Sequence, residues 1–74
     1  MNKERRKRIE EAMSMLQDAR EILEEVQEEE QEYLDNMPEN MQQGEKAETA
    51  QEAIDNLESA IDNIDEATSC VEDI

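Results

Sequence analysis

The sequence predicts an all-α fold, an antiparallel two-helix coiled-coil hairpin that dimerises into a four-helix bundle. Two long segments carry a seven-residue apolar repeat, and one cluster of helix-breaking residues separates them. Aromatic residues make up 1% of the chain, which also holds one Gly and one Pro, and this excludes a sheet protein with Gly-rich turns. We therefore expect one domain, residues 1–74, with a helix over about 2–36, a bend over about 37–44 and a helix over about 45–73.

The first helix is predicted from a heptad repeat. Only Glu30 interrupts the apolar residues at its a and d positions, which are Ile9, Ala12, Leu16, Ala19, Leu23, Val26, Glu30, Tyr33 and Met37. Met13, Met15, Ile22 and Leu34 flank this stripe and make it wide enough to contact two neighbours. We expect Glu30 either to set the register, near Lys46 or the small Ala47 and Ala50, or to line a polar pocket with Tyr33.

The bend is predicted where breakers cluster, around Pro38 and Gly44. Pro38 disfavours helical geometry at the residue before it and lacks an N–H donor, so the first helix ends near Asn36. Gly44 is tolerated as an N-cap of the second helix. Met37 and Met41 either plug the apolar tip of the bundle, which we prefer, or form a soft docking surface.

The second helix has the more regular repeat, over residues 46–73. Only Thr68 is polar among its a and d positions, which are Ala47, Ala50, Ile54, Leu57, Ile61, Ile64, Thr68 and Val71. Two long helices with a short connection fold back antiparallel, which places Val26 near Ile54. Such a hairpin is too small to offset its chain entropy, so we expect a homodimer with candidate interface residues Met13, Ile22, Ala53 and Ala60.

The charge of the chain is strongly acidic and unevenly distributed. The formal net charge is −16, and five of the seven basic residues lie between Lys3 and Arg8. The rest of the chain repels nucleic acid and anionic membranes and favours a basic partner protein. The candidate acidic interaction surface consists of Glu21, Glu24, Glu25, Glu28, Asp55, Asp62, Asp65 and Glu66. Solubility and helix solvation explain the same charges without a partner, and this alternative stays open.

The basic cluster, Lys3, Arg5, Arg6, Lys7 and Arg8, has three interpretations. Cations at a helix N-terminus oppose the helix dipole, and pairing with the acidic C-terminal residues Asp65, Glu66, Glu72 and Asp73 removes this difficulty. Alternatively, Arg5, Arg6 and Arg8 bind phosphate of a nucleotide, or the cluster is a disordered tail. Direct binding of long nucleic acids is not expected, because the acidic body opposes it.

No catalytic pattern is present. The chain has no His, and no arrangement of nucleophile, acid and base, so we expect no enzyme, no cofactor and no metal site. Its single cysteine, Cys70, is expected to be inert. The acidic helical clusters lack the Glu-x-x-His pairs of carboxylate metal bundles. No run of about 18 apolar residues occurs, so a soluble cytoplasmic protein without membrane contact is expected.

A resemblance adds context to this interpretation. The stretch RRKRIEEAMSMLQDAREILEEVQEEEQEYLDNMPENMQ, followed by GEKAETAQEAIDNLESAIDNIDEA, resembles small acidic helical-hairpin proteins encoded by phages and mobile elements of Gram-positive bacteria. Its most specific part is the bend, Leu34 to Gln42. No established activity comes with the resemblance. It implies a phage accessory or anti-defence factor, and some such factors imitate DNA.

Three functions follow from these observations. The first is a non-catalytic acidic interaction protein that binds a basic surface of a host or phage protein. The second is an oligomer that sequesters a nucleotide messenger at the basic N-terminus, and the third is a structural coiled-coil adaptor that binds another helix.

Overall fold

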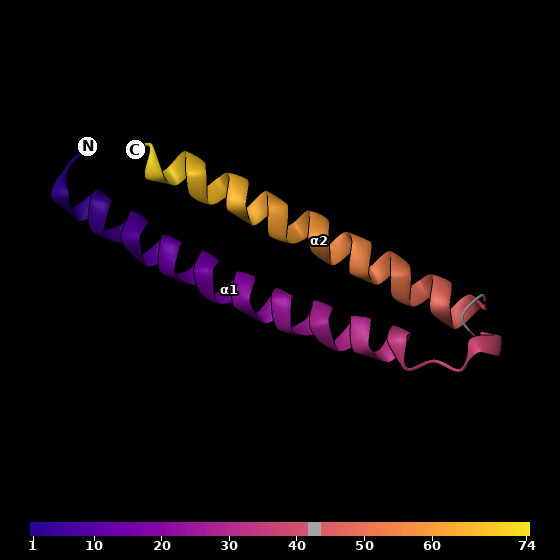
Figure 1. Ribbon diagram of the computed structural model, residues 1–74. Coiled ribbons are helices and arrows are strands. Elements are labelled where there is room, and N and C mark those ends of the chain that lie inside the picture. The colour runs from indigo at the N-terminus through magenta and orange to yellow at the C-terminus, as the bar shows by residue number, and fades with distance from the viewer. Residues whose placement is uncertain (42–43) are drawn as a thin grey trace.

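The computed structural model describes residues 1–41 and 44–74 and is built from helices (Figure 1). Helix α1 spans Lys3–Asp35, the short 3-10 helix η1 spans Glu39–Met41, and helix α2 spans Glu45–Glu72. No strand occurs within these described ranges. The bend expected over 37–44 contains η1, and its residues Gln42 and Gln43 lie outside the described residues.

The ends of α1 have clear local causes. The side-chain oxygen of Asn2 accepts a hydrogen bond of 2.8 Å from the backbone N–H of Arg5, which satisfies one of the free donors of the first turn. At the other end, the N–H of Asn36 donates to the carbonyl of Glu32, and Pro38 follows two residues later. Helix α1 therefore begins with a side-chain cap and ends shortly before Pro38, which cannot continue the helix.

Helix α2 begins differently. Its N-cap is Gly44, which offers no side-chain hydrogen bond, and Glu45 and Glu48 lie in the first turn. Carboxylates near the positive end of the helix dipole stabilise this start. The described bend residues differ in burial, because Met37 is buried while Met41 is exposed.

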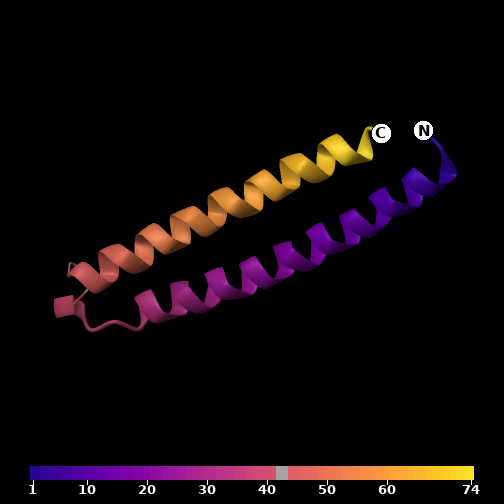
Figure 2. The ribbon, with the colours of Figure 1, turned by 180° about the vertical axis from the view of Figure 1, so that it is seen from behind.

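The two long helices lie side by side along most of their length, and both views agree on this (Figures 1 and 2). The Cα trace is long and thin, with extents of 59 × 15 × 13 Å. Both chain termini lie at the same end of the molecule, and the first turn of α1 extends past the end of α2 (Figure 1). The shape therefore leaves most side chains in contact with water.

The buried core is small and lies mostly on α2. Four of its five residues are in that helix, and the five are Met37, Ala47, Ala50, Ile54 and Ile61. Within α1 no residue is fully buried. All eight a and d positions predicted for the second helix are buried or half-buried, so its seam is the one expected from the repeat. One face of α2 thus packs on α1, and the contact face of α1 stays partly exposed to water.

The seam predicted for the first helix was partly wrong. Three of its d positions, Ala12, Val26 and Tyr33, are exposed. The half-buried positions are instead Ile9, Met13, Leu16, Ala19, Arg20, Leu23, Glu24, Gln27, Glu30 and Leu34. The a positions stay at the contact with α2, whereas the residue after a d position joins or replaces it there. This small rotation of the helix brings two long polar side chains, Arg20 and Gln27, to the contact with α2.

That rotation is stabilised by hydrogen bonds to α2. The side-chain amide of Gln27 donates to the backbone carbonyl of Ile54 over 3.3 Å, and Arg20 bonds to Asp65. Because the seam is open to water on both sides, long polar side chains can pack their stems there and keep their polar ends satisfied. Val26, which was expected beside Ile54, consequently turns to solvent.

Candidate interaction surfaces

Arg20 is the centre of the only ion pairs among the described residues. Its Nε and Nη2 atoms donate to the two carboxylate oxygens of Asp65 over 2.6 and 3.1 Å, and its Nη1 atom bonds to Glu24 one turn along α1. The hydrogen bond from Arg20 lowers the pKa of Asp65, and the bond to Asp65 raises the pKa of Arg20. This bidentate pair joins α1 to α2.

The predicted acidic surface lies on both long helices. Glu21, Glu25 and Glu28 are exposed on α1, and Asp55, Asp62 and Glu66 are exposed on α2. The two remaining members, Glu24 and Asp65, are the carboxylates that Arg20 binds. Within the described part of the chain the six others have no cationic partner, so their charges are directed to solvent or to a second molecule.

The basic cluster of residues 3–8 is exposed throughout. Among residues 1–41 and 44–74 no ion pair links it to the acidic C-terminal residues, and Asp65, which was expected to be one of its partners, binds Arg20 instead. The first turn of α1 extends past α2, which leaves these long side chains in water (Figure 1). Arg5 and Arg8 line one shallow groove with Ile9 and Ala12, whereas Arg6 lies on a different face.

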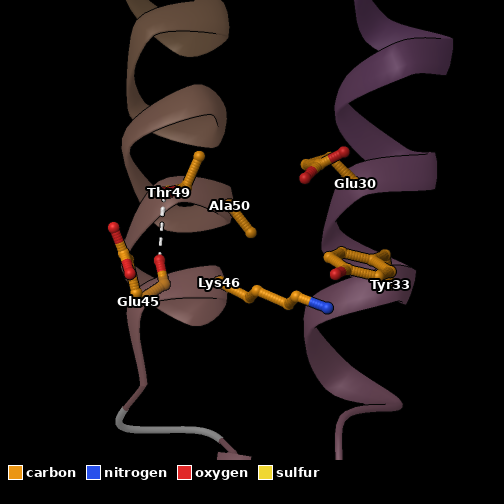
Figure 3. Close-up of a pocket in the computed structure, with 6 residues that line it drawn as sticks. All are labelled: Glu30, Tyr33, Glu45, Lys46, Thr49 and Ala50. Atoms are coloured by element: carbon orange, nitrogen blue, oxygen red, sulfur yellow. Dashed lines mark hydrogen bonds between the residues drawn. The ribbon is translucent and has the colours of Figure 1, made fainter.

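A groove of about 630 Å³ opens between the helices near the bend. Six residues line it, namely Glu30, Tyr33, Glu45, Lys46, Thr49 and Ala50. The Lys46 side chain extends from α2 toward the Tyr33 ring, and Thr49 donates to the carbonyl of Glu45 over 2.9 Å (Figure 3). Glu30 forms no ion pair with Lys46 in the described structure, and it lines this groove together with Tyr33, Lys46 and Ala50, which fits both of the roles expected for it.

Apolar side chains form a second stripe on α1, in which Ala19 is half-buried and the others are exposed to water. We call Ala12, Met15, Ala19, Ile22, Val26 and Tyr33 the outer stripe. Met15 is 62% exposed, Ile22 60%, Tyr33 50% and Val26 41%. From Ala12 to Val26 these residues recur at alternating spacings of three and four, and Tyr33 follows seven residues after Val26, which places them on one face of the helix with Glu29 between the last two. Single exposed apolar residues are ordinary, but several on one helix face are typical of a contact surface.

The expected dimer-interface residues fall in different places. Ile22 lies in the outer stripe, whereas Met13 is half-buried at the contact with α2. Ala53 and Ala60 are half-buried beside the α2 seam. The spacing of the outer stripe is present in the sequence, but its positions adjoin those of the seam, so the apolar pattern alone does not separate the two faces.

No protein-family model, curated protein or solved structure matches the chain. Its surfaces are therefore interpreted from their own chemistry.

Neither long helix, as far as the chain is described, has an apolar stretch long enough to cross a membrane. No group of three or more His, Cys, Asp or Glu side chains in residues 1–41 and 44–74 is arranged to hold a metal ion. Cys70 is a free, exposed thiol. The candidate surfaces are thus the acidic exterior, the basic cluster, the groove near the bend and the outer stripe.

Proposed function

We propose that this chain is a non-catalytic acidic interaction protein that binds the basic surface of another protein. The observation that carries the proposal is the excess of exposed, unpaired carboxylates on a formal net charge of −16. A rod with this charge attracts cationic surfaces over distances near the Debye length, which is about 8 Å at physiological ionic strength. Electrostatic complementarity of this kind contributes chiefly to association rate and specificity.

In solution, we propose, the protein is an antiparallel helical hairpin and two copies form a four-helix bundle. The hydrogen bonds from Arg20 to Asp65 and from Gln27 to Ile54 support the hairpin, because they join residues far apart in sequence. The small core supports association, because five buried residues offset little of the entropy of a 74-residue chain.

A narrower form of the proposal is that the basic surface is a nucleic-acid site and that the acidic rod imitates DNA. Duplex DNA carries one negative charge per about 1.7 Å of helix axis. Two copies side by side carry twice the charge of −16, which over 59 Å is one net charge per about 1.8 Å. The charge density of such a dimer therefore approaches that of a duplex.

A salt-dependent retention experiment tests the interaction. The immobilised protein is incubated with basic DNA-binding proteins at about 50 mM and about 200 mM salt, and we expect retention at the lower concentration only. Two charge-reduced variants locate the surface: Glu21, Glu25 and Glu28 changed to Gln on α1, and Asp55, Asp62 and Glu66 changed to Asn, Asn and Gln on α2. The face that binds loses retention and the other variant is its control. Failure to retain any basic protein at low salt contradicts the proposal.

A phage-encoded, anti-defence role in the bacterial cytoplasm is proposed on the resemblance described above and on the acidic exterior. Its test is expression in a Gram-positive host that carries a defence system with a basic nucleic-acid-binding component. We expect restored phage plaque formation with the unmodified protein and not with the variant that fails in the retention experiment. Equal plaque counts with and without the unmodified protein contradict this role.

Sequestration of a nucleotide is the second candidate, and one observation favours it. Arg5 and Arg8 are exposed, lack ion pairs in the described structure and line the same groove. A nucleotide present at 100 times its dissociation constant stabilises its receptor by about 2.7 kcal/mol. A thermal-shift panel of nucleotides therefore separates the candidates: a shift that disappears in Arg5→Gln supports sequestration, and no shift with any nucleotide contradicts it.

A further inference from the structure

The outer stripe has a length and polarity that fit another helix. It runs from Ala12 to Tyr33, about 31 Å at 1.5 Å per residue. Toward the N-terminus the same spacing continues through Arg8 and Arg5, and the one acidic position within it is Glu29. The stripe therefore has a cationic end, an apolar centre and, near its other end, an acid beside an aromatic ring.

We propose that the outer stripe of α1 packs against the outer stripe of a second copy, with the two α1 helices antiparallel. This inference rests on the dimer proposed above and specifies its surface and orientation. Of the interface residues expected from the sequence, Met13, Ile22, Ala53 and Ala60, it keeps Ile22, which is 60% exposed and lies at the centre of the new interface beside Ala19.

Charge along α1 decides the orientation. The first six residues of the helix hold five cations, whereas residues 25–35 hold six carboxylates and no cation. A parallel pair would place cations beside cations and acids beside acids, which is destabilising. An antiparallel pair places the basic cluster of each copy beside the acidic segment of the other. It also brings carboxylates to a helix start where cations oppose the dipole.

Side-chain size selects the register. In an antiparallel pair each layer joins one position from each copy, and numbers that add to 41 give the best match. The layers then pair Ala19 with Ile22, Met15 with Val26, Ala12 with Glu29 and Arg8 with Tyr33. Small residues meet larger ones at the centre, and Arg8 lies over an aromatic face. If the paired numbers add to 34 instead, Tyr33 lies beyond the start of the other helix and has no helical partner. If they add to 48, Arg8 lies beyond the end of the other helix and leaves the contact.

The groove near the bend provides a receptor for that arginine. It is adjacent to Tyr33, and its carboxylates are Glu30 and Glu45 against the single cation Lys46 (Figure 3). A guanidinium from the second copy that reaches Tyr33 would enter a groove with an aromatic ring and two acids. Stacking on aromatic faces and pairing with carboxylates are both favoured by arginine.

Sedimentation equilibrium on the full chain gives the first test. We expect a dimer at micromolar concentration, and a monomer for Ile22→Glu at the same concentration. Because the core of the hairpin alone is small, circular dichroism should show a loss of helix in this variant that accompanies dissociation. Ile74→Glu is the matched control, because Ile74 is equally exposed, at 54%, but lies outside the stripe, and it should stay dimeric. A monomeric unmodified protein, or a dimeric Ile22→Glu, overturns the proposal.

A charge exchange tests the orientation. Arg8→Glu should raise the dimer dissociation constant about tenfold or more, because it removes the cation beside Tyr33 and creates like charges one layer from Glu29 of the second copy. Adding Glu29→Arg to the same chain should restore the dimer, although positions 8 and 29 are too far apart on one helix to touch. If the double variant dissociates as readily as Arg8→Glu alone, the antiparallel register is wrong.

Distances between spin labels give an independent readout in a Cys70→Ser background. With labels at Gln17→Cys or at Gln31→Cys, both exposed, the proposed register gives axial separations of about 10 Å and about 32 Å between the two copies. A parallel pair gives no axial separation at either site, so equal distances overturn the proposal. Failure of the acidic-surface function alone would abolish retention of basic proteins and leave the dimer and these distances intact.

Discussion

At the scale of single residues, Arg20 and Gln27 connect the two long helices. Both are polar, yet both lie half-buried where α1 meets α2 and hydrogen-bond across to that helix. The heptad pattern of apolar residues predicts that Val26, and not Gln27, lies at this contact. The sequence could not rank them correctly, because the hydrogen bond from Gln27 to the carbonyl of Ile54 depends on the neighbouring backbone, which the repeat does not describe.

The ion pair between Arg20 and Asp65 predicts a specific pH dependence. Its hydrogen bond lowers the pKa of Asp65 below the ordinary 3.8, so its stabilisation is complete above that pH and is lost as the pH falls through the lowered pKa. Asp65→Asn should therefore lower the melting temperature by a few degrees at pH 6, and the difference should shrink below pH 3.8. Asp62→Asn removes the same charge without an ion pair and is the control for thermal denaturation. An equal effect of the two variants at pH 6 would contradict the role of the pair.

The N-cap of α1 gives a second prediction at this scale. Asn2 accepts from the N–H of Arg5, so Asn2→Ala should destabilise the protein by about 1 kcal/mol, whereas Asn2→Asp should retain the cap and improve the charge near the helix start. Chemical denaturation followed by circular dichroism measures both. Unchanged stability of Asn2→Ala would mean that the first turn is not ordered in solution.

At the scale of elements, the two helices differ in how well their repeats predict contacts. The α2 repeat has one apolar series, and every a and d position in it is buried or half-buried. The apolar residues of α1 belong to two series, the half-buried positions at the contact with α2 and the outer stripe, and Ala19 belongs to both. Periodicity therefore predicted both helices and the seam of α2. The orientation of α1 could not be predicted in the same way, because it depends on the hydrogen bonds that Arg20 and Gln27 make to α2.

The assignment of one apolar face to the contact between α1 and α2 and another to the dimer can be tested by changing one isoleucine on each face to alanine. Ile54 is 6% exposed and Ile22 is 60% exposed, although both follow apolar repeats. Ile54→Ala should cost about 2–5 kcal/mol at any protein concentration, because it opens the seam between α1 and α2. Ile22→Ala should lower the melting temperature only at concentrations where the unmodified protein is dimeric. Thermal unfolding at several protein concentrations measures both, and equal losses at the lowest concentration would contradict the assignment of faces.

At the scale of the whole molecule, self-repulsion opposes folding. The formal net charge of −16 is spread over a thin rod whose Cα trace is 15 × 13 Å across. In the described structure only two carboxylates, Glu24 and Asp65, pair with a cation, and that cation is Arg20. The exposure of the acidic residues could be predicted from the sequence, because heptad positions away from the seams face water. The lack of ion pairs between the basic cluster and the C-terminal acids in the described structure could not be predicted, because it depends on where each helix ends.

Relief of this repulsion gives a prediction for the entire chain. The isoelectric point is about 4.1, so lowering the pH from 7 to 5 should raise the melting temperature, as should adding about 0.5 M salt at pH 7. A gain of about 1 kcal/mol corresponds to about 4–8 °C for a domain of this size. Circular dichroism melts measure the change. A melting temperature that falls with either treatment would show that attractive pairs outweigh repulsion.

The most direct measurement of the proposed function is competition with DNA for a basic protein. A fluorescent duplex of about 17 base pairs, which matches the 59 Å length of the protein, is bound to a basic DNA-binding protein and titrated with the unlabelled chain. We expect displacement at about 50 mM salt that weakens at least about tenfold by about 200 mM, and loss of displacement in the variant that fails to retain basic proteins. No displacement at 50 mM salt from any basic protein tested would contradict an acidic exterior that imitates DNA.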